Sequence, residues 1–322
     1  MKIGNVEIEG FAALAPMAGV ADRAMREICT RMGAAYTVGE LASARGITLG
    51  DSKSAELLFC EKNGTPSASQ LFGCEPQIMA QAAKRALQFE PEFIAINMGC
   101  PAPKVAGNGG GSALMQNPRL AGEIVAAVAS AVPVPITVKM RAGWDNGSLN
   151  AVELAKICED AGAKAVTVHG RTRVQMYAPP VNYDIIKAVK RAVKIPVIAN
   201  GDVEDGKSAK FVYDYTGCDF VMVGRAAQGN PFVFSEINAV LSGEEYTPPT
   251  LEERLTVCLQ QIELMHRNKD PHNAILESRK HTAWYLTGIR GAAALRRMCG
   301  EISSMDDVKR ICEKALEQEA QM

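Results

Sequence analysis

The sequence predicts an α/β fold: a TIM-type (β/α)8 barrel at residues 1–243, followed by a small all-helical C-terminal domain at residues 248–322. Strand and helix signals alternate eight times within about 240 residues, close to the typical length of such a barrel. A doubly wound open sheet uses the same alternation, but no dinucleotide-binding fingerprint follows the first strand. After Pro248 the strand signals stop and helical periodicity continues alone. We therefore expect a closed barrel with a helical appendage.

Each predicted strand is a short apolar run that ends at polar or glycine residues, the pattern of a strand covered on both faces. The eight runs cover residues 12–15, 36–38, 67–71, 93–96, 135–140, 165–168, 196–199 and 219–223. Capping signals mark the helices between them: Asp22 and Asn150 precede helical segments, Pro76 and Pro118 open them, and Gly33 closes the first. We expect helices at residues 22–32, 76–89, 118–131, 150–161, 183–193 and 205–215, with looser chain at 44–63.

The C-terminal segment is expected to form four helices, at residues 251–267 and about 273–287, 290–300 and 304–318. The stretch 276–300 contains a single acid, Glu277, and five bases: Arg279, Lys280, Arg290, Arg296 and Arg297. Together with Arg171 and Arg173 at the barrel rim, this basic face can hold RNA phosphates. On charge alone, an ordinary solvated surface is an equally good interpretation.

The composition excludes several classes of protein. The 322 residues carry a net charge of −1, so no overall basic field points to nucleic acid or to a membrane surface. Nine scattered cysteines without a C-x-x-C pair argue against a disulfide framework and against a zinc or iron–sulfur site, so no metal is expected. The N-terminus lacks a signal peptide's apolar run, and no run reaches membrane-spanning length. We expect a cytoplasmic protein without a membrane partner, and no protein partner is evident.

Polar residues lie at the ends of the predicted strands, which is where a barrel carries its chemistry. They are Glu40, Gln70, Asn97, Cys100, Lys139, His169, Asn200 and Arg225. Cys100 is central, because it follows a buried strand and precedes Pro101 and a glycine-rich segment at 107–111. A lone cysteine is usually a small core residue, but eight polar residues that converge at one mouth indicate an active site.

The segment 201–208 matches G-x-x-x-x-G-K-S, the phosphate-binding loop of nucleotide triphosphatases. Asp202, Glu204 and Asp205 would set three negative charges against a triphosphate, so we reject this interpretation. The loops after strands seven and eight of a barrel commonly hold one phosphate. Lys207 and Ser208 are expected to be ordinary helix residues.

The mouth has the residues expected around a flat, phosphorylated cofactor, and flavin mononucleotide (FMN) is the natural candidate. Gly201 and Gly224 let backbone N–H groups approach a phosphate, and Arg225 adds positive charge. Lys139 and His169 can stabilise negative charge on a planar heterocycle, while Gln70 and Asn200 can bind its polar edge. The alternatives are a Lys139 paired with Glu40, a structural His169 and a surface Arg225.

Cys100 has two possible chemical roles. An ordinary thiol is mostly protonated at neutral pH and can donate a proton. It can instead act as a nucleophile, which requires a nearby base. Because a reduced flavin supplies hydride, a reaction that also needs a proton fits the acid role.

Seven motifs along the barrel carry a family resemblance. They are APMAGVADR at 15–23, QLFG at 70–73, INMGCP at 96–101, KMRAGW at 139–144, VHGRTR at 168–173, ANGD at 199–202 and GRA at 224–226. With them the chain resembles the tRNA-dihydrouridine synthase family, and RKHTAWYL at 279–286 resembles its bacterial B-type branch. The chain departs from the family pattern at Ala21 and Ala24, and at Pro179 and Pro180, where the loop is stiffer than usual.

The resemblance implies an FMN-dependent oxidoreductase that uses NADPH or NADH to reduce the C5–C6 bond of selected uridines in tRNA. The flavin would give hydride to C6, and Cys100 would protonate C5. Contacts with the flavin ring or ribityl chain are implied for Pro16, Met17, Ala18, Gln70, Lys139 and His169, and contacts with the phosphate end for Asn200, Gly201, Asp202, Gly224 and Arg225. Substrate binding is expected for Asn97, Arg141, Arg171, Arg173 and the five bases of the helical domain.

Two other functions remain open at this point. One is a flavin-dependent dehydrogenase of a small free pyrimidine, of the dihydroorotate type, which would not need a helical domain to hold RNA. The other is a noncatalytic RNA-binding module, which would have no turnover to lose when Cys100 is replaced.

Overall fold

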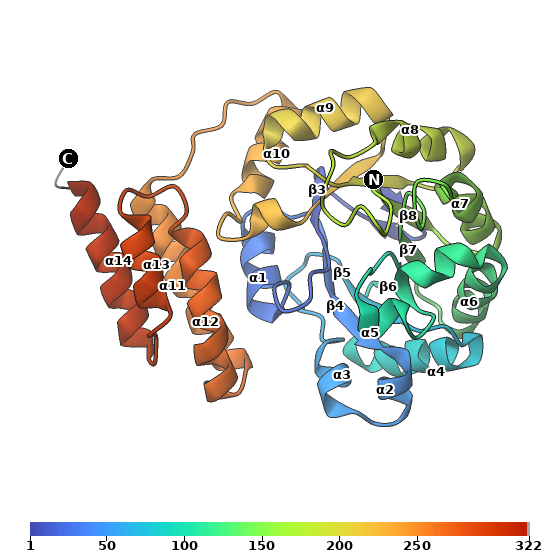
Figure 1. Cartoon of the computed structure of the whole chain (residues 1–322), viewed down its shortest axis with the longest axis horizontal. Helices are drawn as coiled ribbons and strands as arrows, with labels where there is room; N and C mark the ends of the chain where they lie inside the picture. The colour runs from blue at the N-terminus through green and yellow to red at the C-terminus, as the bar shows by residue number, and fades with distance from the viewer. Residues whose placement is uncertain (321–322) are drawn as a thin grey trace.

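Eight parallel strands form a closed barrel in the computed structural model, which describes residues 1–320 (Figure 1). Strands that follow one another in sequence are neighbours, and the last strand closes the barrel by pairing with the first. The barrel strands are β3 (Ala12–Leu14), β4 (Thr37–Ser43), β5 (Ser67–Phe72), β6 (Phe93–Met98), β7 (Ile136–Arg141), β8 (Ala165–His169), β9 (Val197–Asn200) and β10 (Phe220–Val223). The predicted fold class is confirmed.

An apolar cluster fills the amino-terminal end of the barrel. Tyr36, Phe93 and Phe220 stand at the starts of their strands, and the ring centroid of Tyr36 lies 6.0 and 5.7 Å from those of the other two. A hairpin that the sequence did not predict, β1 (Lys2–Ile3) with β2 (Val6–Glu7), adds Ile3 and Ile8 to this cluster. Because this end of the barrel interior is packed with apolar side chains, the interior is left to open at the carboxyl ends of the strands.

Helices surround the barrel close to the predicted positions. Asp22 caps the first helix by accepting a hydrogen bond from the Met25 N–H at 2.8 Å. Asp205 and Ser208 form a capping box at the helix that contains Lys207, as expected of ordinary helix residues. The helices are α1 (Arg23–Arg31), α4 (Pro76–Ala86), α6 (Pro118–Ala131), α7 (Ala151–Asp160), α8 (Tyr183–Ala192), α9 (Gly206–Thr216) and α10 (Val233–Ser242), with the short α2 (Ala44–Thr48), α3 (Ser52–Glu56) and α5 (Pro103–Ala106).

Four local details differ from the prediction. Residues 44–63 contain α2 and α3 rather than only loose chain, and α10 was not predicted. Strand β4 continues to Ser43 through an irregularity in its pairing with β5, so Glu40 lies within the strand instead of at its end. Asn150 precedes α7, but its Oδ1 accepts no capping bond, and its amide nitrogen donates to the Met115 carbonyl at 2.7 Å.

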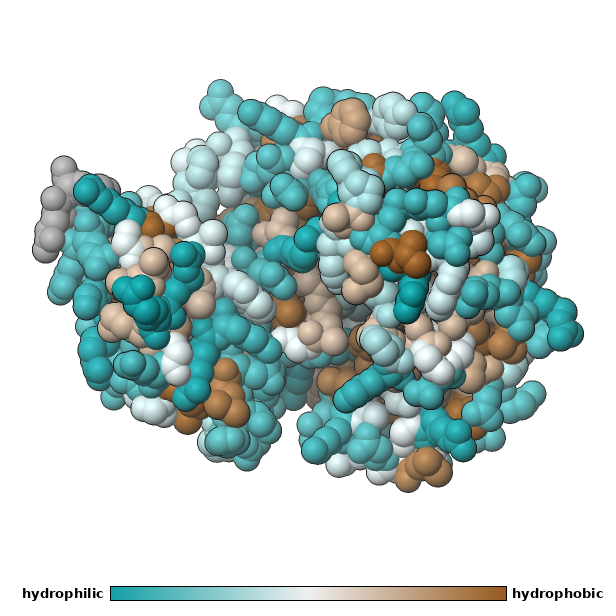
Figure 2. All heavy atoms as spheres, viewed as in Figure 1, coloured by the Kyte–Doolittle hydropathy of each residue, from teal (hydrophilic) through white to brown (hydrophobic). Residues whose placement is uncertain are grey.

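Four helices form the C-terminal region, as predicted: α11 (Leu251–Asn268), α12 (Pro271–Tyr285), α13 (Ala292–Cys299) and α14 (Met305–Ala320). Figure 1 shows them as a separate lobe beside α1. This lobe has its own apolar core, but the core also includes Ala24 and Ile28 of α1. On the face in Figure 2, hydrophilic residues cover most of both lobes and a notch separates their lower parts. The barrel and the helical lobe are therefore joined through α1.

A second close contact joins the two lobes at Gly229, in the chain after β10. Its backbone is left-handed, with φ of +66°, and a Cβ there would lie 2.3 Å from the Trp284 carbonyl carbon. Gly229→Ala is expected to cost about 1–3 kcal/mol of unfolding free energy more than Gly217→Ala, because Gly217 has a similar φ of +68° but open space around it. Chemical denaturation of both variants measures the difference, and equal losses would contradict this contact.

Within residues 1–320, no helix combines the length and the apolar character needed to cross a membrane. All nine cysteines are free thiols, and seven of them are buried.

Candidate active site

A cavity of about 870 Å³ opens at the carboxyl ends of the barrel strands, a size typical of small-molecule sites. It collects most of the residues that the strand-end rule predicted. The predicted residues in its wall are Pro16, Met17, Ala18, Asn97, Cys100, Lys139, Arg141, His169, Asn200, Gly201, Asp202, Gly224 and Arg225. These residues come from six strands or the loops that follow them, so only the closed barrel brings them together.

Cys100 is held by its backbone on both sides while its thiol stays free. The side-chain oxygen of Asn97 accepts hydrogen bonds from the N–H groups of Gly99 at 3.2 Å and Cys100 at 2.9 Å. The Cys100 carbonyl accepts from the Ser112 N–H at 3.1 Å. The Asn97 amide in turn donates to Gln70 Oε1 at 3.0 Å. This support fixes a half-buried thiol at the cavity wall without using the sulfur.

Lys139 and His169 form a second wall of the cavity. The Lys139 ammonium donates to Asn200 Oδ1 at 2.7 Å. It does not pair with Glu40, whose carboxylate accepts from the Gly19 N–H instead, so that alternative was wrong. Burial, followed by the charge of Arg141, lowers the pKa of Lys139 to about 7. Burial and the nearby cations hold the pKa of His169 far below its ordinary value, so its imidazole is neutral.

The depressed pKa of Lys139 predicts a pH-dependent stability of the apoprotein. Between the folded pKa of about 7 and the unfolded value of 10.5, the unfolded chain binds the proton and the folded chain does not. The unfolding free energy of the native sequence should therefore rise between pH 7 and 10 relative to that of Lys139→Met. Denaturant titrations of both proteins across this range measure the difference, and parallel curves would contradict the depressed pKa.

Two buried arginines anchor the loop after β8. Arg171 makes two hydrogen bonds to the Asp202 carboxylate, at 2.9 and 2.6 Å, and its Nε donates to the Pro179 carbonyl at 2.5 Å. Arg141 donates to the carbonyls of Gly99, Thr172 and Met176 at 2.9, 2.9 and 3.0 Å. Both guanidinium groups are thus engaged inside the protein, whereas Arg173 stacks 4.5 Å over the Trp144 ring and is partly exposed. The RNA contacts expected of these arginines stay predictions.

The remaining predicted residues lie outside the cavity wall. Gln70 is fully buried in β5, and its Nε2 is a donor without a partner. In the helical lobe, Arg290, Arg296 and Arg297 are exposed, Lys280 is half-buried, and Arg279 Nε donates to the Ile302 carbonyl at 3.1 Å. The structure therefore separates a barrel cavity from a basic surface on another lobe.

Sequence reasoning missed Met176 and Tyr177, which line the cavity from the loop after β8. Tyr177 is 53% exposed, and the Arg225 guanidinium lies 4.7 Å from its ring centroid. An aromatic residue in a loop directly after a strand end was the available signal. Arg225 itself is half-exposed and lies 3.6 Å from the Asp202 carboxylate.

The sequence model of one family, described as dihydrouridine synthase, matches residues 13–321. The chain belongs to the dihydrouridine synthase family. The tRNA-dihydrouridine synthase B of Vibrio parahaemolyticus is 42% identical over 94% of this chain and 95% of that relative. The protein of the same description from Pseudomonas aeruginosa is 39% identical over 95% of this chain and 92% of its own length. The family and branch predicted from the motifs are confirmed for this dihydrouridine synthase.

Two solved structures share the barrel fold with this member of the family. A variant of NCR from Zymomonas mobilis superimposes with a TM-score of 0.54 at 16% identity, covering 79% of this chain and 93% of that one. Histamine dehydrogenase from a Rhizobium species gives a TM-score of 0.54 at 12% identity, covering 82% of this chain and 50% of that one. At these identities the likeness shows the fold alone.

Proposed function

We propose that this protein is an FMN-dependent tRNA-dihydrouridine synthase, which uses NADPH or NADH to reduce the C5–C6 bond of specific uridines in tRNA. The observation that carries this proposal is the free thiol of Cys100, which lines the same barrel cavity as Lys139 and His169. The names of the B-type relatives, which cover nearly the whole chain, supply the substrate class.

The residues of the cavity fit FMN. Gln70 lies outside the cavity wall but accepts a hydrogen bond from Asn97, which lines it, and its buried amide donor has no protein partner, which suits the polar edge of a flavin ring. A Cβ on Gly201 would lie 2.6 Å from the His169 imidazole, so only glycine, which has no side chain, fits at this position. Gly224 has no neighbour within 3.8 Å of a Cβ position, which leaves its backbone accessible to a phosphate next to Arg225.

Each group keeps the role that its position allows. Pro16, Met17 and Ala18 would pack against the flavin. Lys139 and His169 of the cavity wall, with Gln70 next to it, would bind the ring edge or ribityl chain. The phosphate end would be held by Asn200, Gly201, Asp202, Gly224 and Arg225. When bound, the flavin supplies hydride for C6 of the uracil. Cys100 donates the proton from Sγ to C5, and Asn97 holds the Cys100 backbone in place for this transfer.

The two lobes divide the binding of the substrate. We assign residues 1–243 to the FMN-binding catalytic barrel and residues 248–322 to a tRNA-binding helical domain. A uridine must leave its stack to enter the barrel, and exposed Arg290, Arg296 and Arg297 can hold the surrounding phosphates. A tRNA substrate and nine free thiols both favour the reducing cytoplasm.

The test is a spectrum recorded without oxygen. The purified protein is reduced with NADPH, and tRNA lacking dihydrouridine is then added. We expect the flavin absorbance to bleach and tRNA to restore it, with dihydrouridine formed in the tRNA. If free uracil restores the flavin absorbance and tRNA does not, the result would support the small-pyrimidine reductase instead. A protein that binds no FMN would contradict the cofactor and the mechanism together.

A further inference from the structure

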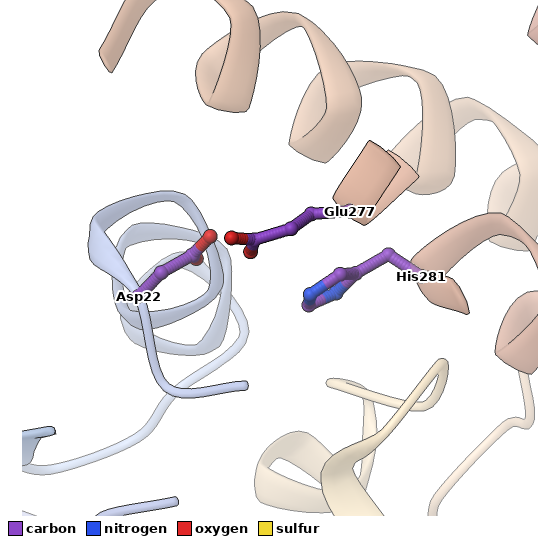
Figure 3. A group of neighbouring side chains, drawn as sticks. All are labelled: Asp22, Glu277 and His281. Carbon is purple, nitrogen blue, oxygen red and sulfur yellow. The ribbon is translucent and has the colours of Figure 1, made fainter. Parts of the chain in front are cut away.

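A cluster of charged groups, partly buried, lies where the helical lobe meets the barrel. Figure 3 shows Asp22, at the start of α1, facing Glu277 and His281 of α12. One oxygen of each carboxylate and one imidazole nitrogen all lie within 4.8 Å of one another. Asp22 is 5% exposed and His281 is 1% exposed. Such a group resembles a three-ligand cation site.

The chain supplies its own cation to this cluster. The ammonium of Lys269, directly after α11, lies 2.5 Å from Asp22 Oδ2 and 2.7 Å from Glu277 Oε2. Lys280 adds a second ammonium, 3.6 Å from the same Glu277 oxygen. Although burial opposes it, the charge of Lys269 keeps the pKa of Asp22 below its ordinary value. Lys269 therefore supplies the positive charge that the two carboxylates would otherwise offer to a metal ion.

Neutral hydrogen bonds hold the helical side of the cluster in place. The Tyr285 hydroxyl donates to Gln261 Oε1 at 2.7 Å, and Gln261 Nε2 lies 2.8 Å from His281 Nδ1. All three side chains are buried, and they join α11 to α12. Glu277, one turn before His281, is thus presented to Lys269 from a rigid pair of helices.

The barrel side of the cluster is continuous with the wall of the cavity. Asp22 lies two residues after Val20, which ends a segment whose Pro16, Met17, Ala18 and Val20 line the cavity. Gly19, in the same segment, donates its N–H to Glu40, and a Cβ on Gly19 would lie 3.4 Å from the Lys280 ammonium. The Lys269 ammonium, through Glu277 and Asp22, therefore links α12 to a segment that lines the active site. Helix α12 also carries Arg279 and Lys280.

We propose that Lys269 is a positioning residue that locks the helical lobe to the flavin-side wall of the barrel, in the register that presents a tRNA-bound uridine to Cys100. This inference rests on the proposed function. If the helical lobe holds the phosphates of tRNA and the barrel holds the uracil base, the two lobes must keep their relative position to within about an ångström. A misplacement of that size at the reacting atoms lowers the rate about a hundredfold. Two carboxylates on different lobes that share one ammonium provide such a constraint.

The test compares Lys269→Ala with Lys269→Arg and with a matched control, Lys210→Ala. Lys210 also pairs with a carboxylate, Asp214 at 3.0 Å, but this pair is exposed on α9. Two half-reactions are measured in the holoenzyme: flavin reduction by NADPH, and reoxidation of the reduced flavin by tRNA. Hydrogen exchange at residues 16–21 and 270–285 is measured in the same proteins, independently of turnover.

We expect Lys269→Ala to lower kcat/KM for tRNA about tenfold or more and to change flavin reduction by less than about twofold. Exchange should rise in both segments, Lys269→Arg should recover part of the activity, and added propylammonium should restore part of it to Lys269→Ala. Lys210→Ala should behave as the native protein does.

Three results separate the possible failures. An unchanged tRNA reaction in Lys269→Ala overturns the positioning role. An equal loss in both half-reactions, without recovery by propylammonium, also overturns it, because a general loss of stability would then explain the variant. A native protein whose reduced flavin does not react with tRNA contradicts the proposed function, while the exchange data still decide whether Lys269 locks the lobes.

Discussion

Replacing Cys100 with serine is expected to lower dihydrouridine formation by a factor of about a hundred to ten thousand while flavin reduction by NADPH continues. Serine keeps the size of the side chain and the backbone bonds to Asn97, but its hydroxyl is a far weaker acid than a thiol. Single-turnover reoxidation by tRNA, followed by nucleoside mass spectrometry of the product, measures the loss.

Cys74→Ser is the matched control for this prediction. Cys74 is the other cysteine that is not buried, but its thiol donates to the Asn108 carbonyl at 3.2 Å and does not line the cavity. The control should keep nearly all of its activity. Product formation by Cys100→Ser at the rate of the control would rule out proton donation by Cys100, whatever the fold of the barrel.

The rule that barrel chemistry lies at strand ends succeeded because the carboxyl ends of parallel strands must converge. Residues as distant in sequence as Met17 and Arg225 reach one cavity for this reason alone. The rule failed for Glu40, because the pairing irregularity between Val38 and Leu41 extends β4 beyond its apolar run. A backbone irregularity of this kind cannot be predicted from the hydrophobic pattern of the sequence.

Burial of charged side chains was the other property that the sequence did not reveal. Arg171 was predicted to be a rim residue for RNA, yet its side chain is 4% exposed because Asp202, from the next strand end, pairs with it.

The division of helix α1 between two apolar cores was also not predicted. Its Met25 and Cys29 pack in the barrel core, while Ala24 and Ile28 pack in the helical lobe. Adjacent residues of one short helix serve two cores, and only the assembled fold separates them.

Replacing Gly201 with alanine is expected to remove most of the bound flavin and to destabilise the apoprotein by about 2–5 kcal/mol. The φ of Gly201 is +114°, a conformation that favours glycine, and a Cβ would lie 2.6 Å from both His169 Cδ2 and Val181 Cγ2. The new methyl group must therefore push His169 from the cavity wall or shift the chain that carries Asp202.

Gly243→Ala separates backbone strain from the loss of the site. Gly243 also has a positive φ, +75°, but it ends α10 with nothing within 4 Å of a Cβ position. The control should lose about 1 kcal/mol of stability and keep its flavin. The ratio of flavin to protein absorbance after purification, and urea denaturation of the apoproteins, measure the two effects. Gly201→Ala with native flavin content would show that the backbone at this position does not need to approach the cofactor, and the phosphate site would then have to rest on Gly224 and Arg225.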